Sequence, residues 1–192
     1  MDMQAANDPR IIDAIWSITA MLDYTDKIAA VVTEELVDWR PGMPDGSYSF
    51  SVGEQLKHIA DYRAYVAEML SGEKAGYVRW AADYPGRDQP WQFREGSLTE
   101  ILERLQFSRS LIQPWLEQGF STLLMPTEGT TQSYTQQLSA LREKGENTAA
   151  LEAAGPGSLA SAILFLVAHE NGHRSVLQTL LRLAGAPVER LA

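Results

Sequence analysis

The three histidines of the chain have the side chains of metal ligands, and two of them also have the spacing. His169 and His173 lie four residues apart, directly after the most apolar stretch of the sequence. On a helix, residues at i and i+4 share a face, with Cβ atoms about 5–6 Å apart. Two imidazoles at that separation can bind one ion at about 2.0–2.1 Å each. The pair is therefore a candidate metal site.

The remaining histidine, His58, lies at the edge of an apolar stripe in an earlier predicted helix, from which it can turn inward. Three neutral imidazoles from two helices leave coordination positions open for water or substrate, as catalytic metal sites do. The chain has no cysteine, so thiolate ligands are excluded. The candidate ions are Zn²⁺, Ni²⁺ and Fe²⁺, and the order of affinities does not choose among them. The alternative is three hydrogen-bonded core histidines without a metal.

The surroundings of the pair predict its orientation. Leu166, Leu177 and Ala162 lie near the same helix face, so we expect the histidines to project toward the interior of the protein. Gly172 lies between them, and a glycine inside a helix costs about 1 kcal/mol relative to alanine. It indicates either the close approach of another helix or ligand, or a tolerated defect.

The segments that carry the histidines are predicted as helices. Two begin at capping boxes, in which a serine oxygen and a glutamate carboxylate three residues later satisfy unpaired backbone donors. Ser51 and Glu54 open a helix that ends at Gly72, and Ser97 and Glu100 open one that runs to Gly119. A first helix is expected from residue 9 to about residue 37, and a last one from 159 to about 184.

The connections are long. Residues 73–96 are rich in glycine, proline and aromatic side chains and are predicted as a crossover loop, to which we assign no site role. Residues 127–133 are turn-like, and short helices are expected over 134–144 and 148–154. Four long helices in 192 residues predict an all-α protein, a four-helix bundle forming a single domain over residues 1–192.

Charge and hydropathy exclude several partners. The formal net charge of −9, without a cluster of Lys and Arg, argues against binding to nucleic acid. The apolar run at 159–167 is much shorter than the roughly 20 residues that span a bilayer, so no membrane partner is expected. The N-terminus lacks the pattern of a signal peptide. These features and the absence of cysteine are those of a soluble, cytoplasmic protein.

The segment from His169 to His173 also matches H-E-x-x-H, the zinc peptidase motif in which the glutamate is the general base. The extended form of that motif requires glycine at 176 and histidine at 179, where this chain has Val176 and Thr179. Glu170 points about 100° away from His169 around the helix. A zinc peptidase is therefore a weak alternative.

Four marks in order resemble the DinB/YfiT-like superfamily of metalloenzymes, over nearly the whole chain. They are Trp39-Arg40-Pro41, the helix start from Ser51 to Ala60, the pair His169 and His173 followed by Arg174, and the closing segment from Leu181 to Pro187. The chain departs from the family where members often read His-Arg-Gly-Gln, because Ser175 and Val176 follow Arg174 here. The departure leaves the candidate ligands in place.

The resemblance implies an up-down-down-up bundle in which His58, His169 and His173 hold a divalent metal. It also implies homodimers and a small-molecule substrate. Some members of the superfamily transfer low-molecular-weight thiols such as mycothiol, bacillithiol or glutathione, or use them to isomerise substrates. We therefore expect a metal-dependent enzyme, thiol S-transferase-like, that activates a thiol or water. The alternative is a non-catalytic bundle with a vestigial or structural metal site.

Overall fold

The computed structural model describes residues 9–42, 49–71, 96–117 and 128–188, and every regular element in those ranges is a helix. The predicted all-α class is confirmed. The helices are α1 (Pro9–Ala29), α2 (Glu34–Val37), α3 (Val52–Ser71), α5 (Leu98–Glu117), α6 (Glu128–Glu143), α7 (Ala149–Ala154) and α8 (Leu159–Leu183). The predicted crossover loop lies almost wholly outside the described residues.

Both predicted capping boxes are present. At the start of α3, the Ser51 amide donates to Glu54 Oε2 at 2.7 Å, and the Glu54 amide donates to Ser51 Oγ at 3.2 Å. At the start of α5, the Ser97 and Glu100 amides make the equivalent bonds at 2.9 and 3.3 Å. Each box satisfies two backbone donors that the helix itself leaves unpaired. The local sequence thus fixes where two of the long helices begin.

The start of α3 is also held by close packing. A Cβ atom at Gly53 would lie 2.7 Å from Cγ1 of Val37 and 3.1 Å from Cδ1 of Ile101. Contacts under 3.0 Å are sterically prohibited, so glycine is required where α2 crosses this end of α3. His58 lies little more than one turn further along α3. Its position therefore depends on a helix end that packs against both Val37 and Ile101.

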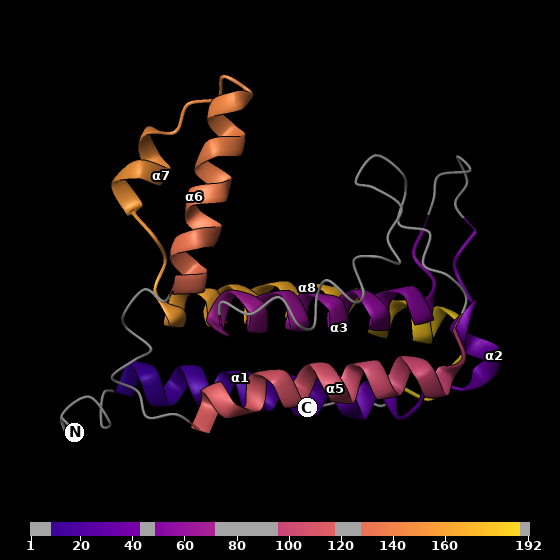
Figure 1. Ribbon diagram of the computed structural model, residues 1–192. Helices are drawn as coiled ribbons and strands as arrows, with labels where there is room; N and C mark the ends of the chain where they lie inside the picture. The colour runs from indigo at the N-terminus through magenta and orange to yellow at the C-terminus, as the bar shows by residue number, and fades with distance from the viewer. Residues whose placement is uncertain (1–8, 43–48, 72–95, 118–127, 189–192) are drawn as a thin grey trace.

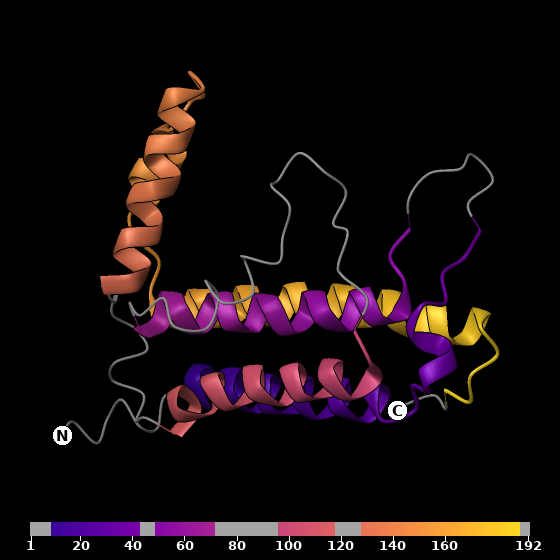
Figure 2. The same ribbon diagram turned by 45° about the vertical axis from the view of Figure 1, so that its right-hand side comes forward.

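Four long helices, α1, α3, α5 and α8, lie side by side (Figures 1 and 2), and their buried apolar side chains form a core of two clusters, one toward each end of the bundle. One end of the core joins the end of α1, the starts of α3 and α5, and the end of α8, through Ile28, Val52, Ile101 and Leu181. The other end joins the opposite ends of the same helices, through Ile18, Val66, Ile112 and Ile163. Helices α1 and α8 therefore run in one direction and α3 and α5 in the other, which is the expected up-down-down-up order.

The first helix is shorter than predicted. It ends at Ala29, and the short helix α2 follows after a turn. The segment Val31-Val32-Thr33 contains three consecutive β-branched residues, which lose side-chain freedom in a helix. Backbone hydrogen bonds there connect residues three apart, and Val32 turns into the core.

Helices α6 and α7 project from one end of the bundle, where α6 contacts α3 (Figures 1 and 2). An ion pair of 2.9 Å between Arg142 and Glu152 joins the two helices. The short helices expected in this region are confirmed, but residues 128–133, predicted as a turn, form the first turns of α6. No helix among the described residues is long and apolar enough to cross a membrane.

Candidate metal centre

The fold brings all three histidines together at the contact between α3 and α8. Each of His58, His169 and His173 offers one ring nitrogen, and these atoms lie within 4.8 Å of one another. The Nε2 atoms of His58 and His169 are 3.3 Å apart. Two nitrogen ligands of a tetrahedral ion with bonds of about 2.0–2.1 Å lie about 3.3–3.4 Å apart. The geometry of this pair fits a single bound ion.

The cluster lies at the surface edge of this helix contact rather than in the bundle interior, which corrects the predicted orientation. All three histidines are half-buried. The core side of α8 is formed by Ile163, Leu166, Glu170 and Leu177, each at most 1% exposed. Because each residue turns a helix by about 100°, the histidines lie to one side of that line, against α3. The cluster is therefore partly exposed to solvent, whereas the core side of α8 is not.

Burial keeps the three imidazoles neutral. Desolvation lowers the pKa of His58 to about 4, with smaller contributions from the neighbouring His173 and His169. Desolvation is also the main cause that lowers the pKa of His169 to about 4, and the electrostatic interaction with His173 is the second cause. Burial lowers the pKa of His173 as well. Only the neutral imidazole has a lone pair for a metal. At neutral pH the cluster is in its ligating state.

A buried glutamine orients one of the rings. Oε1 of Gln55, which is 3% exposed, lies 3.0 Å from Nδ1 of His173 and accepts a hydrogen bond from it. This bond directs the unprotonated Nε2 toward the cluster, as outer partners of metal-binding histidines commonly do. Gln55 was not predicted, although its position three residues before His58 on the same helix face was a usable signal.

Aromatic rings line the cluster on two sides. The Tyr62 ring stacks on His169, with centroids 3.5 Å apart and an interplanar angle of 19°. Phe50 stacks on His58 at 5.9 Å, and Phe165 lies 6.0 Å from Tyr62. Burial raises the pKa of the Tyr62 hydroxyl, so the group stays protonated at neutral pH. The Tyr62 ring thus packs both on His169 and against the apolar core.

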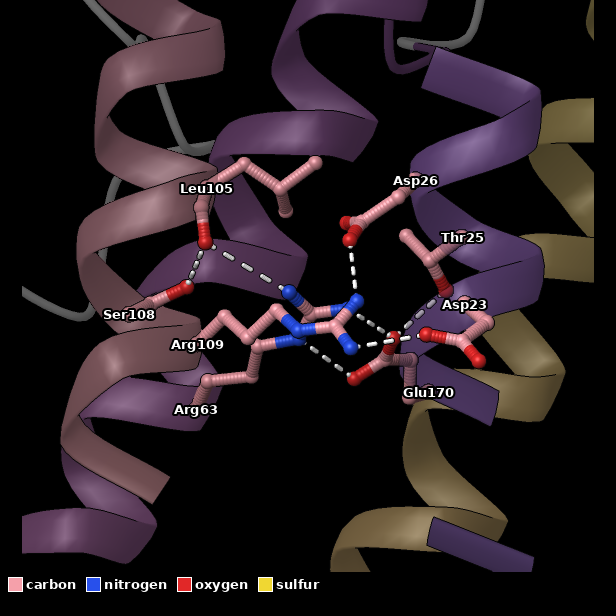
Figure 3. Close-up of polar contacts among 8 residues, drawn as sticks. All are labelled: Asp23, Thr25, Asp26, Arg63, Leu105, Ser108, Arg109 and Glu170. Atoms are coloured by element: carbon pink, nitrogen blue, oxygen red, sulfur yellow. Dashed lines mark hydrogen bonds and ion pairs between the residues drawn. The ribbon is translucent and has the colours of Figure 1, made fainter. Parts of the chain in front are cut away.

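Glu170 is buried in the core, where it meets Arg63 and Thr25 (Figure 3). Its Oε2 accepts a hydrogen bond from Nε of Arg63 at 2.8 Å, and its Oε1 accepts one from Oγ1 of Thr25 at 2.5 Å. Nη2 of Arg63 completes the ion pair at Oε1. Both oxygens are engaged and shielded from solvent, so Glu170 cannot activate water at the cluster. This geometry excludes the catalytic assignment of the H-E-x-x-H match.

Gly172 is exposed, and a Cβ atom placed there would meet no atom of the described structure within 4 Å. Close approach of another helix of the described chain is therefore not the reason for this glycine. In the described part of the chain, no carboxylate joins the three histidines. The candidate donor set is thus made of imidazoles alone.

Comparison with known families gives one match. The model of the DinB superfamily aligns with residues 17–177, which include all three histidines, Gln55 and the Arg63–Glu170 pair. No curated protein and no solved structure matches the chain significantly.

Proposed function

The chain belongs to the DinB superfamily, and we propose that it is a metal-dependent enzyme whose ion is held by His58, His169 and His173. The observation that carries the proposal is the convergence of three neutral ring nitrogens within 4.8 Å at a half-buried edge. Three protein ligands leave at least one position of a tetrahedral ion open, which is the arrangement of catalytic rather than structural zinc. Zn²⁺, Ni²⁺ and Fe²⁺ all accept such imidazole donors.

The reaction class proposed is transfer of a low-molecular-weight thiol to an electrophile. When bound, a divalent ion lowers the pKa of a thiol or water that it coordinates. The chain contains no cysteine, so the thiol must come from a cosubstrate. Gln55 holds the ring of His173 in its ligating tautomer, and the Phe50 and Tyr62 rings provide apolar surfaces beside the cluster.

Thiol transfer is tested with a general electrophile. Zn²⁺- or Ni²⁺-loaded protein is mixed with glutathione, bacillithiol or mycothiol and monochlorobimane. The thiol sulfur forms the new C–S bond, chloride leaves, and the thiol proton passes to buffer. We expect at least a tenfold faster formation of the fluorescent adduct than with His169→Ala. Equal rates for the two proteins with every thiol would contradict thiol transfer, and hydrolysis of an activated ester would then support metal-bound water as the nucleophile.

A structural ion is the second candidate, favoured by the fact that the three ligands connect two different helices. Such an ion is expected to have no open position. Azide or thiol added to Co²⁺-loaded protein separates the two functions, because ligand exchange changes the visible absorption of cobalt only where a position is open. An unchanged spectrum, together with a large loss of thermal stability on metal removal, would favour the structural ion.

We also propose that the functional unit is a homodimer in which a second copy covers the exposed face of α8. Leu164, Phe165, Val176 and Leu183 are 44–64% exposed along that face. Gly172, with open space around it, lies in the middle and permits the close approach of a helix from outside the chain. Light scattering should show a dimer for the wild type and a monomer for Val176→Glu. Phe107→Glu, on the exposed face of α5, is the control and should remain dimeric; a monomeric wild type would contradict the proposal.

A further inference from the structure

The Arg63–Glu170 ion pair is the centre of a polar node to which all four bundle helices contribute (Figure 3). Thr25 comes from α1, Arg63 from α3 and Glu170 from α8, and none is more than 1% exposed. From α5, the Leu105 carbonyl accepts a hydrogen bond from Nη1 of Arg63 at 3.5 Å and another from Oγ of Ser108 at 2.7 Å. Charged side chains are almost never buried to this extent unless they are paired.

The geometry of this node is directional, unlike the apolar core around it. Arg63 donates to both oxygens of Glu170, through Nε and Nη2, in the two-pronged arrangement that fixes the relative orientation of a guanidinium and a carboxylate. Apolar contacts have no such directional requirement. Rotating α8 about its axis, or sliding it along α3, would leave a buried charge without its partner, which is strongly unfavourable.

The node and the histidine cluster lie on the same two helices at the same level. Glu170 is the residue after His169, and Arg63 is the residue after Tyr62, whose ring stacks on His169. A displacement of α8 that separates Glu170 from Arg63 would therefore also move His169 away from His58. The two Nε2 atoms are only 3.3 Å apart, so a shift of 1 Å matters to shared coordination.

We propose that Arg63, Glu170 and Thr25 are positioning residues that fix the rotation of α8 against α3 and so hold the three histidines in ligating register. This inference rests on the metal site proposed above. It gives a physical reason for the glutamate within the H-E-x-x-H match, since its carboxylate acts through helix orientation and never contacts the ion. It also distinguishes orientation from stability, because an apolar pair of similar volume can replace a buried ion pair without loss of stability.

The test is the double variant Arg63→Met/Glu170→Met, which removes both charges and keeps the volume. Cobalt(II) is titrated into this variant and into the wild type, with helical circular dichroism and melting temperature measured beside it. We expect the variant to fold and melt near the wild-type temperature, but to bind Co²⁺ 10–100-fold more weakly, as loss of outer-shell support typically does. Its visible cobalt bands should also change in shape, which a loss of stability alone would not produce.

Arg109→Met is the matched control. Arg109 makes ion pairs with Asp23 and Asp26 between α5 and α1, also drawn in Figure 3, but it is 27% exposed and far less shielded. Its replacement should leave Co²⁺ affinity and spectrum unchanged. If the double variant does not fold, Thr25→Val and Thr25→Ser give a milder pair. Valine should weaken Co²⁺ binding several-fold, and serine, which keeps the hydroxyl, should restore it.

The outcomes separate the two proposals. A wild type that binds no Co²⁺ overturns the metal site, and the positioning role with it. A wild type that binds Co²⁺, beside a folded double variant with the same affinity and the same spectrum, overturns the positioning role alone. Should only the threonine pair be measurable, equal affinities for valine and serine at position 25 overturn the positioning role in the same way.

Discussion

Two polar clusters occupy the contact between α3 and α8, and they differ in how completely their polar atoms are satisfied. In the core, both oxygens of Glu170 are bonded to Arg63 and Thr25. At the half-buried edge, the three histidines face one another, and Nδ1 of His169 is buried without a hydrogen-bond partner among the described residues. The carboxylate of the core cluster is thus fully paired within the protein, and we call this cluster closed. The histidine cluster keeps a buried ring nitrogen without such a partner, and we call it open.

This difference teaches how to separate structural from ligand-binding polar groups on one helix pair. A closed and fully buried cluster has no capacity for a further ligand, so its chemistry is complete within the fold. The half-buried cluster of neutral imidazoles brings one ring nitrogen of each histidine within 4.8 Å of the others. The adjacent residues His169 and Glu170 therefore lie in different environments, although a sequence motif treats them as one unit.

The largest loss of stability is expected from removing one partner of the buried Arg63–Glu170 ion pair. Arg63→Met alone leaves the Glu170 carboxylate buried without its cation, and such a loss typically costs about 3–5 kcal/mol. The free energy of unfolding, measured in urea on metal-free protein, should fall by that amount. A fall of less than about 1 kcal/mol, as for an exposed ion pair, would show that the buried and exposed clusters do not differ as described.

A smaller effect, on metal affinity, is expected from removing the hydrogen bond between Gln55 and His173. Gln55→Leu removes the acceptor that directs His173 Nδ1, and losing an outer-shell partner commonly weakens metal binding 10–100-fold. Zinc affinity, measured by competition with a chromophoric chelator, should fall in that range. Gln55→Glu keeps an acceptor at this position and serves as the comparison. Equal affinities for the leucine variant and the wild type would remove Gln55 from the site.

The smallest effect is expected at the exposed ion pairs between α1 and α5. Arg109 is 27% exposed, and its partners Asp23 and Asp26 are 49% and 35% exposed. Exposed pairs contribute about 0–1 kcal/mol because water and salt screen them. Arg109→Ala should lower the free energy of unfolding by no more than that, and less at 0.5 M NaCl. A loss as large as that of Arg63→Met would mean that burial does not determine how much each arginine contributes to the free energy of unfolding.

The sequence predicted those parts of the fold that depend on local chemistry. The two capping boxes identified the starts of α3 and α5, because both partners lie within four residues. Periodicity and glycine identified α8 and its end, where Gly185 has a φ of +78°. The break after Ala29 was missed, since a run of apolar β-branched residues keeps the helical pattern while disfavouring the helix itself.

The sequence predicted that the three histidines come together, which the structure shows, but not the residues that support them. The i, i+4 spacing of His169 and His173 is a local feature, whereas the contacts of Gln55 with His173 and of Arg63 with Glu170 connect residues more than 100 positions apart. The pattern of apolar residues on α8 did not show that Glu170 takes the core position, because a buried carboxylate requires a cation from another helix. Arg63, a charge within the apolar stripe of α3, was the available signal.

Metal content by plasma mass spectrometry on tag-free protein tests the three-histidine site most directly. The wild type is compared with His58→Ala, His169→Ala and His173→Ala after incubation with Zn²⁺ or Ni²⁺ and removal of free ions. We expect about one divalent ion per chain in the wild type, lost in each single variant because three ligands share one ion. A wild type without metal, or variants that retain it, would contradict the site and return the histidines to a packing role between α3 and α8.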